Sequence, residues 1–528
     1  MVKSQLNEIL NLTDQEIKER WIHHNTNLII PEEYKTKEQI IKFLDEINQK
    51  RQDYLDQGYE KIEEVKQEVQ KALALRLRRE ATELITSNIK KRAKIYTTRD
   101  DNNSEMYVYN KGIYIPEGKT YIREYNRHVL DELYTTTIVN EVIAKIEADT
   151  YIEQNKFFEN KHIELVPVQN GLLNIFTREL QPFNSDIIFF NKLPMEYNPE
   201  AECPNVIRHF EEVLKEKEDI KVMQELFGYL LLRDYKIEKA VMLHGNGRNG
   251  KGKTVELMKR FIGAENCTNI TLEQLEKDNF CLGELFNKMA NISADISSTS
   301  LKNTGTFKSL TGHDLISAPR KFKTNIQFVN YAKMIYCSND LPRTYDKSTA
   351  FFQRWVLFDF PFTFLSQKEI DNIGEKDAKN VKLADPELIN KLCDPLELSG
   401  LLNWALVGLK RLLEQKDFSD SPGTKDIKNR WIGKSDSFSA FLMEYVEEDW
   451  DSQITKQDLQ KEYSNYCKKN KLLRKGERHI KNVLSIDYGV ETVRKSVHYH
   501  GEDYPTQIRV WEGIKWNEKY YFEKKKTG

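Results

Sequence analysis

A glycine-rich stretch near the middle of the chain has the residue types and spacing of a phosphate-binding loop. Residues 240–263 read AVMLHGNGRNGKGKTVELMKRFIG, which gives an apolar strand, a glycine-rich loop and an amphipathic helix in the order that such a loop requires. Glycines let backbone N–H groups turn toward phosphate oxygens, the helix N-terminus adds a positive dipole, and a lysine neutralises the β and γ oxygens. The stretch therefore predicts a site for a nucleoside triphosphate.

The motif GxxxxGK[ST] fits this stretch in two registers. One register makes Lys253 the phosphate lysine and Thr254 the magnesium ligand. The other begins at Gly245 and makes Lys251 the phosphate lysine, with a glycine where the hydroxyl is expected. We favour Lys251, because the apolar run stops at His244 and a tight turn must follow the strand directly; Lys253 and Thr254 stay in the predicted site as nearby contributors. The predicted nucleotide-binding residues are Gly245, Asn246, Gly247, Arg248, Asn249, Gly250, Lys251, Gly252, Lys253 and Thr254.

Three polar residues further along the chain have the chemistry that phosphoryl transfer needs. Asp295 ends a short β-like run, KMANISAD, 44 positions after Lys251, where a carboxylate would hold Mg²⁺ beside the γ-phosphate. Asn339 ends another such run, AKMIYCSN, and its amide could orient the attacking water. Arg354 lies in AFFQRWVLFDFPF and could reach a neighbouring subunit's nucleotide as an arginine finger. The simpler alternatives are an ordinary loop aspartate at 295 and a structural salt bridge at 354.

These motifs together carry a resemblance to a known family. In chain order they are GNGRNGKGK, the strand ending in Asp295, LKNTGTFKSLTGHDLISAPRKFKTNIQF, MIYCSNDLP and FFQRW. The set resembles the superfamily 3 helicases, and more specifically the branch shared by poxvirus helicase-primases and phage or plasmid primase-helicases. The chain also resembles the domain that precedes the motor in that branch, in VPVQNGLLNIFTRELQPF, LPMEYNPEAECP and MQELFGYLL. The resemblance covers about residues 90–365.

The resemblance implies a ring of AAA+ motors, expected to be a hexamer, with ATP and Mg²⁺ at each subunit boundary. Lys251 would bind the phosphates, and Asp295 would hold Mg²⁺ and activate water. Asn339 would be the sensor residue and Arg354 the arginine finger. Two features depart from the family pattern: Gly252 replaces the usual Ser or Thr, and Asp295 has no acidic neighbour.

The segment between Asp295 and Asn339 matches the DNA-gripping hairpin of the family, and its charge agrees. From residue 288 to residue 333 the chain has seven Lys or Arg against two Asp, a local charge of +5. Cations around an aromatic side chain suit a single strand, whose phosphates need charge and whose bases can stack. A solvated turn is the alternative. The predicted DNA-binding residues at the hairpin tip are Arg320, Lys321, Phe322 and Lys323.

The last 58 residues also carry a charge of +5, from thirteen basic and eight acidic side chains. Helices followed by two β-like segments predict a winged-helix module, in which a helix enters a DNA groove and a wing contacts phosphates. Lys475, Arg478 and Lys481 are expected on one helix face. Arg494 and Lys495 are expected to begin the wing. A packing domain without DNA contacts is the alternative.

The elements that must position these residues predict an α/β protein with an AAA+ P-loop core. From about residue 37 to residue 93 the chain reads as long charged helices without proline, and short alternating stretches with an Asn-Gly turn at 170–171 follow. The predicted parts are a helical region at 1–95, an α+β domain at 96–200, the AAA+ ATPase core at 201–365, a helical subdomain at 366–431 and a winged-helix-like domain at 432–528.

Composition narrows the remaining classes. The chain has 528 residues with 80 Lys plus Arg and 82 Asp plus Glu, a net charge of −2 that conceals −4 over residues 198–234 and the two basic segments. We therefore expect salt-dependent DNA binding despite the balanced total. The six cysteines form no CxxC pair, which argues against a zinc or redox motif. No run approaches the roughly 18 apolar residues of a membrane span, so we expect a soluble protein of the host cytoplasm with no membrane partner.

The leading hypothesis is an ATP-dependent replicative DNA helicase of a virus, plasmid or integrated mobile element that moves on single-stranded DNA as a ring. Its expected partners are single-stranded and forked DNA, further copies of itself and other replication proteins. A non-unwinding AAA+ protein that binds or loads at an origin is the first alternative. A combined primase-helicase is disfavoured, because the region before residue 90 is helical and too short for a primase fold.

Overall fold

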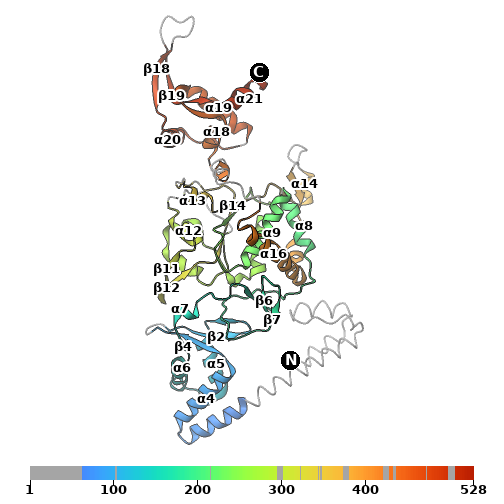
Figure 1. Cartoon of the computed structure of the whole chain (residues 1–528), viewed down its shortest axis with the longest axis vertical. Helices are drawn as coiled ribbons and strands as arrows, with labels where there is room; N and C mark the ends of the chain where they lie inside the picture. Colours follow the sequence, from blue (N-terminus) through green and yellow to red (C-terminus); the bar gives the residue numbers. More distant parts are fainter. Residues whose placement is uncertain are drawn as a thin grey trace, which may run out of the picture. The chain divides into compact units, whose positions relative to one another are not determined.

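The computed structural model describes residues 62–100, 104–214, 216–293, 301, 303–320, 323–342, 344, 346, 348–372, 380–419, 427, 429–431, 436–470, 472–497 and 506–527. Over these residues the chain is a mixed α/β protein, which confirms the predicted class. It divides into two compact units, one formed by Met1–Tyr109 and Ile115–Gln154 and the other by Asn110–Tyr114 and Asn155–Gly528 (Figure 1). Among the described helices, none combines the length and the apolar content needed to cross a membrane.

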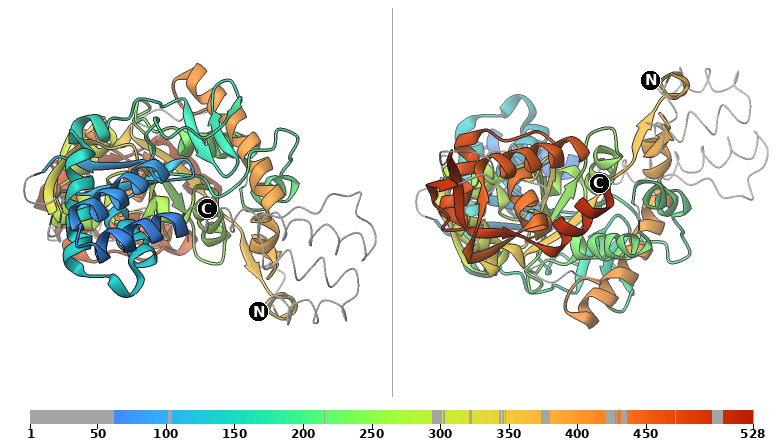
Figure 2. Two further views of the ribbon diagram at one scale, coloured as in Figure 1. Left: turned by 90° about the horizontal axis from the view of Figure 1, so that it is seen from below. Right: turned by 90° about the horizontal axis from the view of Figure 1, so that it is seen from above.

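The first unit combines a four-stranded sheet with helices that bury apolar side chains at helical spacing. Ile85 and Ile89 are fully buried on one helix, and Val142 and Ile146 are fully buried on another. The sheet has the strand order β3-β2-β1-β4. The left view of Figure 2 shows the helices of this unit in blue and teal. The elements are α4 (Arg78–Arg92), β1 (Ile95–Thr98), β2 (Met106–Asn110), β3 (Ile113–Ile115), α5 (Gly118–Leu130), α6 (Thr136–Asp149) and β4 (Tyr151–Ile152).

A small antiparallel sheet precedes the central sheet of the second unit. Its first two strands pair Val168 with Gly171, so the hairpin turn consists of Gln169 and Asn170. The turn lies one residue before the predicted Asn-Gly pair, because Gly171 already belongs to the second strand. The elements are α7 (Gln154–Phe157), β5 (Leu165–Val168), β6 (Gly171–Asn174) and β7 (Leu180–Gln181).

The central sheet of the second unit has five parallel strands in the order β14-β8-β13-β10-β9. Its inner strands are buried on both faces, as is usual for a parallel sheet covered by helices. Because the strands run in one direction, their carboxyl ends meet at one edge, where open α/β sheets bind ligands. The elements are α8 (Pro204–Val213), α9 (Lys217–Leu231), β8 (Ala240–His244), α10 (Lys251–Ile262), β9 (Cys267–Thr268), α11 (Leu272–Lys277), β10 (Ala290–Ser293), α12 (Gly305–Thr311), β11 (Leu315–Arg320), β12 (Lys323–Val329), β13 (Lys333–Ser338), α13 (Thr349–Phe352) and β14 (Trp355–Asp359).

The segment after the central sheet packs back onto α9. Its long helix has glycines where the two helices touch: a Cβ at Gly408 would lie 2.2 Å from the carbonyl oxygen of Gln224. Arg411 forms an ion pair of 2.5 Å with the fully buried Glu225 of α9. The elements are β15 (Thr363–Leu365), α14 (Gln367–Asp371), β16 (Val381–Leu383), α15 (Leu388–Leu392) and α16 (Pro395–Gln415).

The last described segment has its own apolar core, built around Phe441, Tyr463 and Trp511. Its sheet has three strands in the order β17-β19-β18, one more than the predicted two-stranded hairpin. The right view of Figure 2 shows this segment in red. The elements are α18 (Ser437–Tyr445), β17 (Val446–Thr455), α19 (Lys456–Lys469), α20 (Glu477–Asp487), β18 (Thr492–Val497), β19 (Thr506–Trp516) and α21 (Glu518–Thr527).

Candidate nucleotide-binding site

The glycine-rich loop joins β8 to α10 at the carboxyl edge of the central sheet. Gly247 and Gly250 have φ angles of 70° and 89°, in the left-handed region that favours glycine. Gly250 also packs tightly on α8, because a Cβ there would lie 2.4 Å from Cγ1 of Val213. The loop therefore needs glycine both for its backbone and for its close approach to α8.

Lys251 is the first residue of α10, and its side chain turns back under the loop. Its Nζ donates to the carbonyl oxygen of Ser338 at 3.1 Å, to Oδ1 of Asn339 at 2.9 Å and to the carbonyl oxygen of Gly245. An ammonium group that binds three oxygen acceptors can exchange them for phosphate oxygens. The structure thus brings together the two predicted residues Lys251 and Asn339, which lie 88 positions apart, and it favours the register that begins at Gly245.

Thr254 lies one turn further along α10 and is fully buried. Its Oγ1 is 3.0 Å from Nε2 of His209 in α8. Burial lowers the pKa of His209 to about 4, so the imidazole is neutral at physiological pH. The assignment of Thr254 as a magnesium ligand stays a prediction. Lys253 is half-buried on the same helix.

A cavity of about 740 Å³ opens beside the loop. Its wall continues from the loop to Val213 of α8, Ser366 before α14 and Leu388 of α15. Arg248 of the loop crosses to Glu369 of α14 in an ion pair of 2.5 Å, and this contact together with hydrogen bonds from Ser366 lowers the pKa of Glu369 to about 2. The volume is within the range of small-molecule sites, and the glycine loop with Lys251 fits the triphosphate of a nucleotide.

The predicted magnesium carboxylate, Asp295, lies outside the described residues. Strand β10 ends two positions before it, at Ser293, between β13 and β9. The buried Oγ of Ser293 has no hydrogen-bond partner among the described residues. No cluster of three or more potential metal ligands occurs in the described part of the chain.

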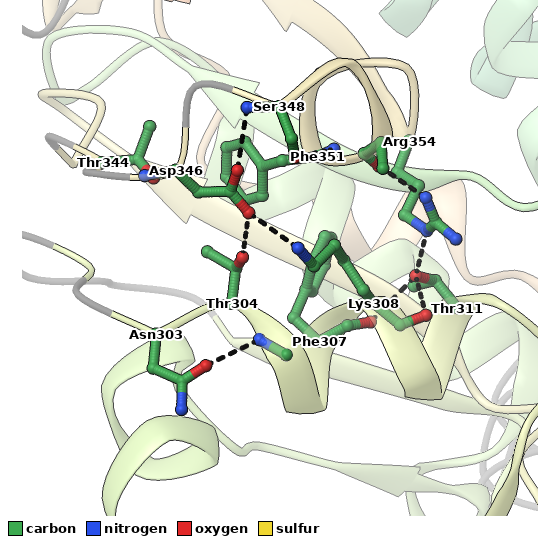
Figure 3. A network of polar contacts seen from close by, with 12 residues as sticks. Asn303, Thr304, Phe307, Lys308, Thr311, Thr344, Asp346, Ser348, Phe351 and Arg354 are labelled. Carbon is green, nitrogen blue, oxygen red and sulfur yellow. Dashed lines mark hydrogen bonds and ion pairs between the residues drawn. The ribbon is translucent and has the colours of Figure 1, made fainter.

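Arg354 lies at the opposite edge of the sheet from the loop. It precedes β14, whose first residue pairs with Ala240, so the five residues of β8, about 16 Å of strand, separate it from the loop. Its guanidinium is largely buried and forms an ion pair of 3.0 Å with Glu238. It also donates to Thr311 Oγ1 at 3.0 Å (Figure 3). The structure does not bring Arg354 close to Lys251 within one chain. Arg354 instead forms the structural salt bridge that was the simpler alternative to an arginine finger.

Sequence reasoning missed a second polar cluster beside the loop. His244 and Asp359 end the neighbouring strands β8 and β14, and their Nδ1 and Oδ1 atoms are 3.0 Å apart. Arg430 donates to the other carboxylate oxygen at 3.0 Å. The three residues line a cavity of about 500 Å³ together with Gly245. The rule that selected Asp295, a carboxylate where a strand ends, would also have selected Asp359.

The predicted hairpin is confirmed as β11 and β12. Arg320 pairs with Lys323 across its end, and Arg320 Nε donates to the carbonyl oxygen of Thr324 at 3.2 Å. Lys321 and Phe322 lie outside the described residues. The contact of this hairpin with DNA stays a prediction.

The basic residues of the C-terminal segment are placed partly as expected. Arg478 and Lys481 are exposed on α20, as predicted. Lys475 precedes the helix, which begins only after the capping Gly476, so the predicted place of Lys475 on the helix face is wrong. Sequence reasoning missed Arg509, which lies directly opposite Arg494 in the antiparallel pair β18–β19. The remaining predicted residue, Lys495, forms an ion pair of 2.6 Å with Glu512.

Comparison with known proteins agrees with the motif order. Residues 13–217 match a family described as D5 N terminal like, and residues 243–354 match a family of unknown function, DUF5906. A protein of Acanthamoeba polyphaga mimivirus with the provisional name helicase L207/L206 is 25% identical over 341 residues, which are 61% of this chain. The chain fits the superfamily 3 helicase and primase-helicase branch. It spans about a third of the length of the mimivirus relative, 34%.

Two solved structures are also similar. The C-terminal region of NrS-1 aligns over 81% of this chain and 98% of its own, with 15% identity and a TM-score of 0.43. The JCV helicase aligns over 50% of this chain and 64% of its own, with 14% identity and a TM-score of 0.23. At these scores neither likeness carries an argument about the fold or the site.

Proposed function

We propose that this chain is an ATP-driven DNA helicase subunit of a virus, plasmid or integrated mobile element, built on an AAA+ core and acting as a ring on single-stranded DNA. The observation that carries the proposal is the contact between Lys251 and Asn339 beneath a glycine-rich loop at the carboxyl edge of a parallel sheet. This arrangement serves the hydrolysis of a triphosphate, because the lysine can bind the γ-phosphate while the neighbouring amide orients water. The match to a helicase-named relative supports DNA as the second substrate.

In this proposal the residues of the chain divide the work of hydrolysis. Lys251 exchanges its carbonyl acceptors for phosphate oxygens, and the loop amides bind the remaining charge. Asp295 would hold Mg²⁺, which when bound neutralises the β and γ oxygens. Arg354 of a neighbouring subunit would complete the site only if it left its own partners Glu238, Thr311 and the carbonyl oxygen of Ala350.

The β11–β12 hairpin and the C-terminal segment are the proposed DNA contacts. The hairpin projects cations at its end, and the C-terminal segment, proposed as a winged helix, presents Arg478 and Lys481 on α20 and the pair Arg494 and Arg509 on its strands. Two arginines directly opposite on neighbouring strands repel each other unless an anion lies between them. A DNA phosphate would relieve this repulsion.

Strand displacement on forked DNA, measured beside ATP hydrolysis, tests the proposal. Lys251→Met should lower ATP hydrolysis by about 100-fold or more and abolish strand displacement, whereas Lys253→Met, at a nearby contributor two positions away, should lower both far less. Replacement of Lys321 and Lys323 by alanine should abolish strand displacement and leave nucleotide binding intact. Wild-type protein that hydrolyses ATP but separates no strands would favour the origin-binding or loading alternative.

A further inference from the structure

The short helix α12, which directly precedes the β11–β12 hairpin, is held at both ends by the segment that follows β13 (Figure 3). At its beginning, Thr304 Oγ1 donates to the carboxylate of Asp346, and Lys308 Nζ lies 3.0 Å from the same oxygen. At its end, Arg354 Nε donates to Thr311 Oγ1 at 3.0 Å. Side-chain contacts therefore fix the beginning of α12 to Asp346 and its end to Arg354.

Asp346 is the centre of the first of these contacts. Its side chain is only 14% exposed, and its Oδ1 accepts the backbone N–H of Ser348 at 2.8 Å. Burial alone would raise the pKa of Asp346, but hydrogen bonds from Ser348, Thr304 and Lys308 together hold it well below the usual range. The carboxylate is therefore ionised and holds several groups from two elements.

The segment that contains Asp346 begins at the nucleotide site. Strand β13 ends at Ser338, and the next residue, Asn339, accepts a hydrogen bond from Lys251. Asp346 follows seven positions later. Between them, the carbonyl oxygen of Pro342 accepts a hydrogen bond of 2.8 Å from the indole of Trp431. The contacts along this stretch therefore include those of Asn339 with Lys251, of Pro342 with Trp431 and of Asp346 with α12.

The other end of α12 leads directly into the hairpin. Thr311, its last residue, is fully buried, and three residues separate it from Leu315, the first residue of β11. The far strand is tied to the same helix, because Asn330 Nδ2, just after β12, donates to the carbonyl oxygen of Leu310 at 3.0 Å. A shift of α12 therefore displaces the base of both strands.

We propose that Asp346, paired with Lys308, is a positioning residue that transmits the occupancy of the nucleotide site to the hairpin. The inference rests on the proposed function. When phosphate oxygens replace Asn339 as acceptors of the Lys251 ammonium, Asn339 loses its hydrogen-bond donor, and the segment that begins there changes its set of contacts. Because Asp346 holds α12, the hairpin base follows that change, and DNA bound at the hairpin acts back on hydrolysis through the same contact.

The test compares Asp346→Asn, Lys308→Met and their combination in the full chain, with ATP hydrolysis measured with and without single-stranded DNA. We expect nucleotide affinity and the basal rate to stay within about twofold, while the stimulation by DNA falls about fivefold or more. The combination should lose little more than Asp346→Asn alone, since both variants remove the same ion pair. Lys308→Arg keeps the ion pair and should restore most of the stimulation.

Glu273→Gln is the matched control, because it removes an ion pair of 2.5 Å with Lys277 on α11, outside the proposed path. It should leave the stimulation unchanged. Wild-type protein without any DNA stimulation would overturn the proposed function itself. Stimulated wild type with unaltered Asp346 and Lys308 variants would overturn only the coupling. Equal losses of basal and stimulated rates, with a lowered unfolding temperature, would show a structural role and overturn it as well.

Discussion

Alanine at Gly250 should weaken nucleotide binding far more than alanine at Gly252, although the two glycines lie two positions apart. Gly250 has φ of 89° and ψ of −14°, and this left-handed conformation costs an L-residue about 1–2 kcal/mol. Its new Cβ would also meet Cγ1 of the buried Val213 at 2.4 Å, and overpacking adds about 1–3 kcal/mol. At Gly252 nothing lies within 4 Å of a Cβ, and alanine in a helix is favoured over glycine by up to about 1 kcal/mol.

The strain at Gly250 can be relieved only if the loop leaves the geometry that presents its amides to phosphate. The lower bound of about 2 kcal/mol corresponds to about 30-fold weaker binding. Titration of a fluorescent ATP analogue measures the affinity, and thermal unfolding shows whether each variant folds. Gly250→Ala should bind at least about 30-fold more weakly than the wild type, whereas Gly252→Ala should bind normally. Equal affinities of the two variants would refute the reasoning.

A second substitution separates the two causes of strain. Val213→Ala combined with Gly250→Ala removes the close contact but leaves the left-handed backbone, so affinity should recover in part. The interaction energy of the pair gives the share that belongs to the contact. No recovery at all would show that α8 does not limit the loop.

Three further outcomes follow from the same geometry. Gly252→Ser should lower the Mg²⁺ concentration for half-maximal ATP hydrolysis by about tenfold, the effect of a ligand worth about 1.4 kcal/mol; an unchanged requirement would count against this position as the missing hydroxyl. Alanine at each of Arg494 and Arg509 should reduce the slope of log affinity for DNA against log salt by about 1, while Lys519→Ala, which also removes one positive charge, should leave it as it is. The pKa of His209, lowered to about 4 in the fold against an ordinary 6.5, means that the unfolded chain binds more protons between these values. The free energy of unfolding should therefore fall by about 2 kcal/mol from pH 7 to pH 5, in denaturant titrations of wild type but not of His209→Gln.

The phosphate loop can be predicted from the sequence because its chemistry is local. Strand, glycines, lysine and helix follow one another within about twenty residues, and the end of the apolar run at His244 favours Lys251 over Lys253. The contact with Asn339 is also predictable in kind, because Asn339 directly follows one parallel strand and Lys251 begins the helix that follows the loop of its neighbour. The prediction for Lys475 is wrong for an equally local reason. The three-residue spacing places Lys475 on the same helix as Arg478 and Lys481, but the helix begins only after Gly476.

What the sequence leaves undetermined is the set of partners that arrive from distant positions. The guanidinium of Arg354 meets Thr311 and Glu238, which lie 43 and 116 positions away, and no local pattern reveals either contact. The position of Arg354 in the sequence suggests an arginine finger, whereas its contacts in the structure anchor α12 within its own chain. The burial of Arg354 sets what a finger role would require. Its side chain would have to give up an ion pair and two hydrogen bonds, to Thr311 and to the carbonyl oxygen of Ala350, before it could reach a neighbour's nucleotide. If subunits do form a ring, assembly must therefore compete directly with the contacts that hold the hairpin helix in place.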